Sequence, residues 1–297
     1  MPGLRFSQAW REAEQRLLDA GLSFGQGTED AAQEAAWMLL HCLGWPLLES
    51  FARLPALQRR VVPEAALLRL RELLEQRVRT RRPLAYLLGE AWLHGQRFLA
   101  DERAIVPRSL IAELLDEGLD PWLRAEPARI ADLCTGGASL AILAARRWPG
   151  AQVTGGDISE PALELARANV ELHGLGGRVR LLRSDLFEAF EPGPRFDLVL
   201  CNPPYVNEAS MRALPREFQH EPRLALAGGG DGMDLVRRLL REAARHLDPR
   251  GVMVVEIGHE RAHFEAAFPR LEVHWLPVSA GDDAVFLVEA SALEPGA

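Results

Sequence analysis

Four consecutive residues carry the clearest chemistry in this sequence: Asn202, Pro203, Pro204 and Tyr205. The apolar run before them, Phe196–Cys201, predicts a buried strand that the prolines prevent from continuing. Asn202 is therefore expected to be extended at the carboxyl end of a strand, the edge where α/β sheets bind ligands. Its side-chain carbonyl and a backbone carbonyl can accept both hydrogens of a planar NH2 group, with Tyr205 against the face of that group. The pattern predicts an amide or an exocyclic amine as substrate.

Asn-Pro-Pro alone is ordinary turn chemistry, so the interpretation depends on a second motif upstream. Residues 132–138 read Asp-Leu-Cys-Thr-Gly-Gly-Ala, after a predicted strand and before a predicted helix. Gly136 and Gly137 let a ligand approach the backbone, and the helix start supplies unpaired N–H groups. The next predicted strand ends at Asp157, about 20 positions further on, where a carboxylate can accept both ribose hydroxyls of a nucleoside.

The same arrangement also binds nicotinamide dinucleotides, which need three spaced glycines for the pyrophosphate. Here the third position is Ala138, and the turn has no basic residue. S-adenosylmethionine, which carries no phosphate, therefore fits better. Asp132 would take its amino group and Asp185 the adenine amine, although a helix N-cap explains Asp185 equally well. The predicted cofactor residues are Asp132, Thr135, Gly136, Gly137, Asp157, Ile158, Asp185, Leu186 and Asn202.

The first part of the chain predicts a small helical domain over residues 1–91, which we expect to recognise the substrate protein because it carries the basic cluster and none of the cofactor motifs. Apolar residues at three- and four-residue spacing indicate helices at Ser7–Leu18, Thr28–Leu43 and Pro63–Arg79. We interpret the basic cluster that closes this domain as a solvated helix end, with a partner-binding patch as the alternative; it comprises Arg77, Arg79, Arg81 and Arg82. Short extended runs then predict a β-hairpin linker over residues 92–108, formed by residues 92–94, 97–99 and 104–106.

Strands and helices alternate over residues 109–297, which predicts a mostly parallel sheet covered on both faces. The expected strands are Arg129–Cys134, Gln152–Gly156, Val179–Arg183, Phe196–Cys201, Val252–Ile257, Val273–Pro277 and Val285–Glu289. The last two have no room for a helix between them, so they should pair antiparallel. The predicted fold is an α/β, Rossmann-like, seven-stranded methyltransferase sheet with the helical domain and hairpin linker before it.

Composition and charge narrow the function classes. With 48% hydrophobic and 26% charged residues, no long apolar segment and no secretory signal, the chain is expected to be cytoplasmic and to bind no membrane. Residues 1–100 carry 13 arginines against 11 acidic residues, and the remainder carries 21 against 31. An acidic main domain argues against stable DNA binding. The scattered cysteines, Cys42, Cys134 and Cys201, predict reduced thiols and no metal site.

With these residues in place, the chain resembles the bacterial protein-glutamine N5-methyltransferases over nearly its whole length. One branch of this family modifies the Gly-Gly-Gln loop of peptide release factors, and another modifies a glutamine of the third large-subunit ribosomal protein. The release-factor branch typically reads Ile-Pro-Arg-Pro-Asp-Thr-Glu where residues 106–113 read Val-Pro-Arg-Ser-Leu-Ile-Ala-Glu. Together with Pro-Leu-Ala-Tyr-Leu at 83–87 and His-Glu-Pro at 220–222, this form resembles the ribosomal-protein branch.

The resemblance implies methyl transfer from S-adenosylmethionine to the side-chain N5 of a glutamine in that 50S protein, either free or within an assembly intermediate. Asn202 and the Pro203 carbonyl would orient the amide nitrogen, and Tyr205 would hold the amide plane. No strong base is required, because the sulfonium is already activated. The catalytic residues are then Asn202, Pro203 and Tyr205, and the acceptor site comprises Asn202, Pro203, Pro204, Tyr205, Pro107, Arg108 and Glu221. Alternatives are release-factor methylation, amino-methylation of DNA or RNA bases, and a non-catalytic assembly scaffold.

Two departures from the family pattern bear on the cofactor. The glycine turn usually reads Gly-x-Gly, so the Ala138 methyl group is expected to crowd the cofactor. Gly155 and Gly156 stand before Asp157 where a larger apolar residue is common, so the ribose contact is expected to be less rigid.

Overall fold

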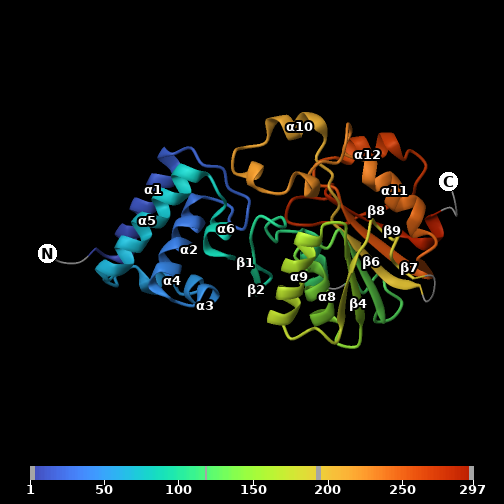
Figure 1. Cartoon of the computed structure of the whole chain (residues 1–297), viewed down its shortest axis with the longest axis horizontal. Helices are drawn as coiled ribbons and strands as arrows, with labels where there is room; N and C mark the ends of the chain where they lie inside the picture. Colours follow the sequence, from blue (N-terminus) through green and yellow to red (C-terminus); the bar gives the residue numbers. More distant parts are fainter. Residues whose placement is uncertain (1–3, 118, 192–194, 294–297) are drawn as a thin grey trace. The chain divides into compact units, whose positions relative to one another are not determined.

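The first part of the chain folds into helices whose apolar residues recur at helical spacing, as predicted. The computed structural model describes residues 4–117, 119–191 and 195–293. Its helices in this region are α1 Phe6–Asp19, α2 Ala31–Leu43, α3 Leu47–Phe51, α4 Leu54–Leu57, α5 Glu64–Thr80 and α6 Leu84–Leu88 (Figure 1). Asp30, not Thr28, caps α2, because its side chain accepts from the Gln33 N–H at 2.8 Å. Gly44 ends α2 in the left-handed region, with φ of 66°.

Two compact units divide the chain. One comprises Met1–Ala91 with Pro215–His220, and the other comprises Trp92–Leu214 with Glu221–Ala297. We call them the helical unit and the sheet unit. The segment Pro215–His220 thus belongs to the helical unit, although the sequence pattern had placed it in the second domain.

A two-stranded sheet, β1 Glu90–Leu93 and β2 Gln96–Leu99, forms at the predicted hairpin. The third extended run, residues 104–106, was predicted wrongly, because it forms no strand. The backbone N–H of Val106 instead donates to a carboxylate oxygen of Glu221 at 3.0 Å.

The sheet unit contains the predicted seven-stranded sheet, in the order β5-β4-β3-β6-β7-β9-β8. Its strands are β3 Arg129–Leu133, β4 Gln152–Asp157, β5 Val179–Arg183, β6 Phe196–Cys201, β7 Leu247–Glu256, β8 His274–Trp275 and β9 Val285–Glu289. Neighbours from β5 to β7 run parallel, whereas β9 is antiparallel to both β7 and β8. The predicted antiparallel pairing of the last two strands is therefore confirmed.

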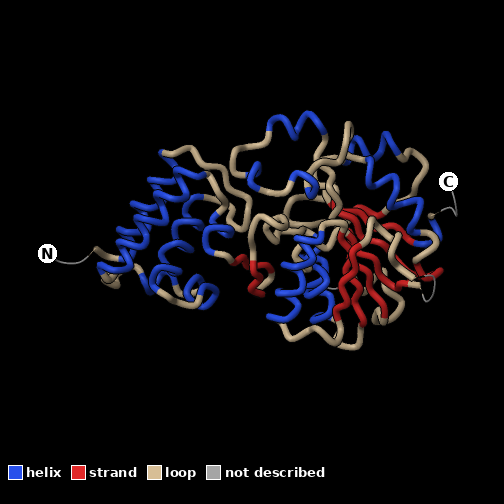
Figure 2. The backbone as a smooth tube through the Cα atoms, viewed as in Figure 1, coloured by secondary structure: helices blue, strands red, loops and turns tan. Residues whose placement is uncertain are grey.

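Helices cover both faces of this sheet, as expected for buried parallel strands (Figure 2). They are α7 Ile111–Glu117, α8 Ser139–Arg147, α9 Glu160–Leu172, α11 Asp234–Ala243 and α12 Arg261–Ala267. The short helix α10 Glu208–Ala213, in the loop after β6, has no buried residue and covers neither face. Alternate residues along each strand enter two separate cores. Ile130 packs in the core that α7, α8 and α9 share, and Ala131 packs in the core that α11 and α12 share. Among the described residues, no helix combines the length and apolar character that a bilayer crossing requires.

Candidate active site

The carboxyl ends of the parallel strands bring the predicted motifs to one edge of the sheet. In the strand register, Leu133 pairs with Gly156 on one side and with Cys201 on the other. The glycine turn, Asp157 and Asn202 each follow one of these strand ends, so their backbones are neighbours. This is the topological switch point at which open α/β sheets bind ligands.

A cavity of about 520 Å³ opens at this edge. Its volume lies within the usual range for small-molecule sites. Seven of the predicted residues line it: Gly136, Asp157, Ile158, Asp185, Leu186, Asn202 and Pro204. The other predicted residues do not line it: Asp132, Thr135, Gly137, Pro203, Tyr205, Pro107, Arg108 and Glu221.

The glycine turn approaches the cavity through Gly136, whose φ is 52°. A Cβ built there meets only the Ala104 Cβ, at 3.8 Å, so this side of the turn is open. Ala138 also adopts a left-handed conformation, with φ of 64°, but its methyl group is fully buried in the core beside α8. The expectation that this methyl group crowds the cofactor was wrong, because it faces the core and not the cavity.

Asp132 supports the turn from below. Its Oδ2 accepts from the Thr135 hydroxyl at 2.5 Å and from the Ala141 N–H at 3.0 Å, and the residue is 1% exposed. Burial raises the pKa of Asp132 to about 7. The structure thus gives this carboxylate partners within the turn and the following helix, where the sequence analysis had assigned it the cofactor's amino group.

Asp157 points its carboxylate at the glycine turn and at the cavity. Oδ2 accepts from the Gly136 N–H at 2.9 Å, and Oδ1 accepts from the Ser159 N–H at 2.8 Å. Burial raises the pKa of Asp157, and these backbone donors oppose that shift by favouring the ionised form. Each carboxylate oxygen keeps a further lone pair for a ligand hydroxyl.

The glycines before Asp157 are packed closely. A Cβ at Gly155 would lie 2.9 Å from the Thr135 Oγ1, and a Cβ at Gly156 would lie 2.8 Å from the Phe190 ring. Neighbouring side chains therefore occupy the space that a side chain at either position would need. The strand end is closely packed, and the reduced rigidity of the ribose contact stays a prediction.

Asp185 has a cationic partner that the sequence pattern did not reveal. Its carboxylate lies 3.1 Å from the Arg238 guanidinium of α11, and both residues line the cavity. Ser184 shapes the same turn, because its hydroxyl donates to the Leu186 carbonyl at 2.7 Å and accepts from the Ala189 N–H at 3.0 Å. Leu186 consequently adopts a φ of 48°, unusual for a residue with a side chain.

The Asn202 motif is followed by a backbone bridge that fixes its carboxyl end. In the described chain, no hydrogen bond engages the Asn202 side chain, which borders the cavity. After the motif, the Val206 N–H donates to Leu226 at 2.8 Å, and the Gly228 N–H donates to Val206 at 2.9 Å. The extended backbone that the prolines predicted is thus continued by a short bridge to residues 226–228.

Tyr205 is fixed by a buried carboxylate that sequence reasoning missed. The Tyr205 hydroxyl lies 3.3 Å from Glu256 Oε1, and Glu256 Oε2 accepts from the Ser109 hydroxyl at 2.6 Å and the Leu110 N–H at 2.9 Å. Burial raises the pKa of both Tyr205 and Glu256. A signal was present, since Glu256 interrupts the otherwise apolar run Val252–Ile257.

Three glycines surround Tyr205. A Cβ at Gly228 or Gly232 would lie within 2.7 Å of the Tyr205 backbone, and a Cβ at Gly258 would lie 2.7 Å from the Tyr205 ring. The tyrosine therefore sits in a cradle that only residues without side chains can form.

Arg108 and Glu221, which the sequence predicted for the acceptor site, pair with each other inside the protein. The Arg108 guanidinium pairs with Glu221 through both nitrogens, with Nη2 2.8 Å from Oε2. Glu221 is 4% exposed and also accepts from Val106.

A second missed residue, Asn169, is fully buried and donates to the carbonyls of Gly137 and Leu99 at 2.9 Å and 3.2 Å. In the described ranges, no cluster of three or more His, Cys, Asp or Glu side chains could hold a metal ion.

The fold and this site define an S-adenosylmethionine-dependent methyltransferase. Residues 112–232 match the family described as methyltransferase small domain, and residues 8–89 match the PrmC N-terminal domain.

Curated relatives narrow the class further. The ribosomal protein uL3 glutamine methyltransferase of Bordetella pertussis is 50% identical over 287 residues, which cover 95% of this chain and 94% of the relative. The proteins of the same name from Burkholderia pseudomallei and Neisseria meningitidis serogroup A are 48% and 45% identical, and their matches cover 94% and 92% of those relatives and 95% of this chain. The chain belongs to the ribosomal protein uL3 glutamine methyltransferase family, which confirms the family and the branch predicted from the sequence.

Proposed function

We propose that this protein transfers a methyl group to the side-chain N5 of a glutamine in ribosomal protein uL3. The observation that carries the proposal is the position of Asn202, which borders the same cavity as Gly136 and Asp157. The reaction requires a side chain that can bind the substrate amide next to a site large enough for a nucleoside. The names of the relatives support uL3 as the protein acceptor.

The acceptor residues supply geometry more than acid–base chemistry. An amide nitrogen is a poor nucleophile, because its lone pair is delocalised into the carbonyl. Asn202 and the Pro203 carbonyl each accept one amide hydrogen, which turns the lone-pair side toward the methyl donor. Orientation of this kind contributes several kcal/mol, up to roughly 7–11 in favourable cases. Tyr205 keeps the amide plane in place, supported by Glu256 and the glycine cradle.

The cofactor proposal follows the cavity lining. Asp157 would hold the ribose hydroxyls, Gly136 would admit the ligand beside the backbone, and Ile158, Asp185 and Leu186, which line the same cavity, would contact the adenine. When bound, S-adenosylmethionine supplies a sulfonium methyl group that needs no further activation. Asp132 would act indirectly in this arrangement, since it braces Thr135 and the start of α8 beside the glycine turn.

Mass spectrometry tests the proposed acceptor. Ribosomal proteins and release factors from a deletion strain, and from the strain complemented with wild type or with Asn202→Ala, are compared for methylated glutamine. We expect uL3 to lose one methyl group in the deletion strain and to regain it only with the wild-type protein. Methylation of a release factor, or of nucleic acid, in place of uL3 would refute the assignment.

The state of the acceptor is a finer part of the proposal. We propose that uL3 is modified in the cytoplasm, free or within an early assembly intermediate, because the glutamine must reach a partly enclosed site. Purified uL3 and isolated large-subunit precursors can be offered as separate substrates to labelled cofactor and enzyme. Incorporation into mature 50S subunits at the same rate would contradict this order of events.

A further inference from the structure

The chain leaves the sheet unit after α10, enters the helical unit as Pro215–His220 and returns at Glu221. This excursion lies in the connection that follows the Asn202 motif. We call residues 206–228, which follow the Asn202 motif, the acceptor-site loop. Residues 215–220 belong to this loop along the chain, but their contacts place them in the helical unit.

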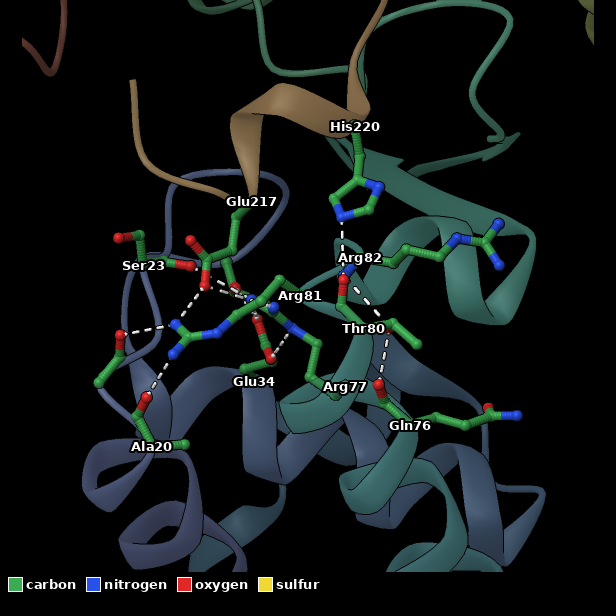
Figure 3. Close-up of polar contacts among 12 residues, drawn as sticks. Ala20, Ser23, Glu34, Gln76, Arg77, Thr80, Arg81, Arg82, Glu217 and His220 are labelled. Carbon is green, nitrogen blue, oxygen red and sulfur yellow. Dashed lines mark hydrogen bonds and ion pairs between the residues drawn. The ribbon is translucent and has the colours of Figure 1, made fainter. Parts of the chain in front are cut away.

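Glu217 anchors the excursion inside the helical unit. Its Oε1 lies 3.0 Å from Arg81 Nη1 and 3.9 Å from Arg77 Nη1, and its side chain is 2% exposed. Figure 3 shows the carboxylate pointing toward these two guanidinium groups, with Glu34 on the other side of Arg77. His220 adds a second contact, because its Nε2 lies 3.0 Å from the Thr80 carbonyl.

The arginines that receive Glu217 were interpreted from sequence as a solvated helix end. That interpretation was wrong for Arg77, which is 1% exposed and pairs with Glu34 at 2.8 Å. Arg81 donates to the carbonyls of Ala20 and Gly21 and to Glu217, so it is equally engaged. Two arginines of the cluster, Arg77 and Arg81, therefore bind a segment of the same chain.

Charge balance makes this anchorage specific. The buried group holds two guanidinium and two carboxylate side chains, and Arg77 Nη1 has no hydrogen-bond partner apart from this ion pairing. Burial opposes ionisation of Glu217, but the hydrogen bond from Arg81 and the charge of Arg77 hold its pKa below the usual value. Loss of the Glu217 charge would leave two guanidinium groups beside the single carboxylate of Glu34, with Arg77 buried and Arg81 partly exposed, which is unfavourable.

The same loop is fixed in the sheet unit on both sides of the excursion. Before it, Val206 bridges to residues 226–228, and the Asn207 amide donates to Glu260 at 2.7 Å. After it, Glu221 is clamped by Arg108. Residues 226–228 include Gly228, a wall of the Tyr205 cradle. Glu217 and Tyr205 thus lie on one connection of the chain, which these contacts fix on both sides of the excursion.

We infer that Glu217 is a positioning residue for methyl transfer, because it ties the acceptor-site loop to the helical unit. The helical unit then contributes to the geometry of the reaction as well as to partner recognition. This inference rests on the proposed function. It predicts that disturbance of the tie lowers the turnover of bound substrate and leaves the cofactor site intact.

The test compares Glu217→Gln with Glu208→Gln in the full-length protein. Glu208 lies on α10 in the same loop, and its pair with Arg212 is solvent-exposed, so it serves as the matched control. Hydrogen exchange of residues 206–228, cofactor affinity by calorimetry, and kcat and KM with uL3 are measured for each. Arg81→Gln provides a second variant if Glu217→Gln folds poorly, because Arg81 is 25% exposed and its loss leaves the Arg77–Glu34 pair in place.

We expect Glu217→Gln to raise exchange across the loop and to lower kcat by about 10- to 100-fold. Cofactor affinity should stay within about twofold, as for an independent site, and Glu217→Asp should recover part of the turnover. An increase in KM alone, with normal exchange, would overturn the inference and limit Glu217 to partner recognition. If the wild type fails to methylate uL3, the proposed function fails, and the exchange measurement still decides whether the tie exists.

Discussion

The side chain of Asn202 carries an amide group, and we expect this group to recognise the side-chain amide of the substrate glutamine. The cavity position and the absence of an internal partner among the described residues leave both of its polar atoms available. Glu256 and Tyr205 show how a neighbouring side chain is held in place while Asn202 stays free. We therefore expect Asn202 to orient the substrate amide, whereas Glu256 holds Tyr205 in place.

Replacement of Asn202 tests the orienting role. Asn202→Ala should leave S-adenosylmethionine affinity within a few-fold, and should reduce single-turnover methyl transfer by about two to three orders of magnitude. Asn202→Asp keeps an acceptor oxygen in nearly the same place and should retain a detectable fraction of the activity. Single-turnover assays with labelled cofactor and uL3 measure both. Equal rates for Asn202→Ala and wild type would remove the central role of this residue.

Asp132 should make stability depend on pH in an unusual direction. Burial raises its pKa to about 7, whereas an aspartate in an unfolded chain titrates near 3.9. Folding therefore takes up a proton between about pH 4 and pH 7, so the free energy of unfolding decreases as pH rises through this window, by up to about 1.4 kcal/mol per pH unit.

Asp132→Asn removes this contribution and serves as the reference. Urea denaturation at several pH values should show that the stability of wild type relative to the variant falls as pH rises toward neutrality and then levels off. A difference that stays constant with pH would contradict the assigned proton uptake.

At the scale of elements, the strands and the edge that carries the site follow from hydrophobic pattern, because alternation of strands and helices leaves few topologies. The sequence could not place Ser109 against Glu256, or Arg238 beside Asp185, because such contacts depend on side chains meeting across elements. Residues 104–106 show the same limit. Their pattern is strand-like, but Val106 bonds to a carboxylate that is distant in sequence. The local sequence pattern predicts helices and strands, but tertiary contacts decide which hydrogen bonds their residues form.

The close packing at the end of β4 gives a prediction at this scale. Gly156→Ala should lower the free energy of unfolding by about 1–3 kcal/mol, because the new methyl group meets the Phe190 ring in a filled core. Gly176→Ala is the matched control, since its Cβ would meet nothing within 4 Å, and its effect should stay within about 0.5 kcal/mol. Urea denaturation of both variants measures the contrast. Similar losses in the two proteins would show that β4 can relax.

For the whole molecule, the helical unit was predicted from its basic cluster to select the partner. The basic cluster no longer supports this role, because Arg77 pairs with Glu34 and Arg81 pairs with Glu217 inside the unit. The composition could not reveal this, because the carboxylate that neutralises the cluster lies far along the chain. We therefore expect uL3 recognition by this unit to involve residues other than Arg77 and Arg81.

Deletion of residues 1–90 should spare cofactor binding and abolish methylation of uL3. The cavity lining lies entirely within the sheet unit, so calorimetry with S-adenosylmethionine should give an affinity within a few-fold of wild type. Methylation should fail because partner recognition and the anchorage of residues 215–220 are lost together. Modification of uL3 at the wild-type rate by the truncated protein would show that neither contribution is needed.

The excursion of Pro215–His220 also constrains the order in which the protein folds during its synthesis. Residues 4–91 emerge from the ribosome first, but Glu217 follows Arg77 by well over a hundred positions. At 5–20 residues per second, the helices wait on the order of ten seconds for the carboxylate that completes their interior. During this interval Arg77 lacks one of its counter-charges, and the unit is incomplete. A helical fragment alone should therefore melt at a lower temperature than the same fragment mixed with a peptide of residues 213–222.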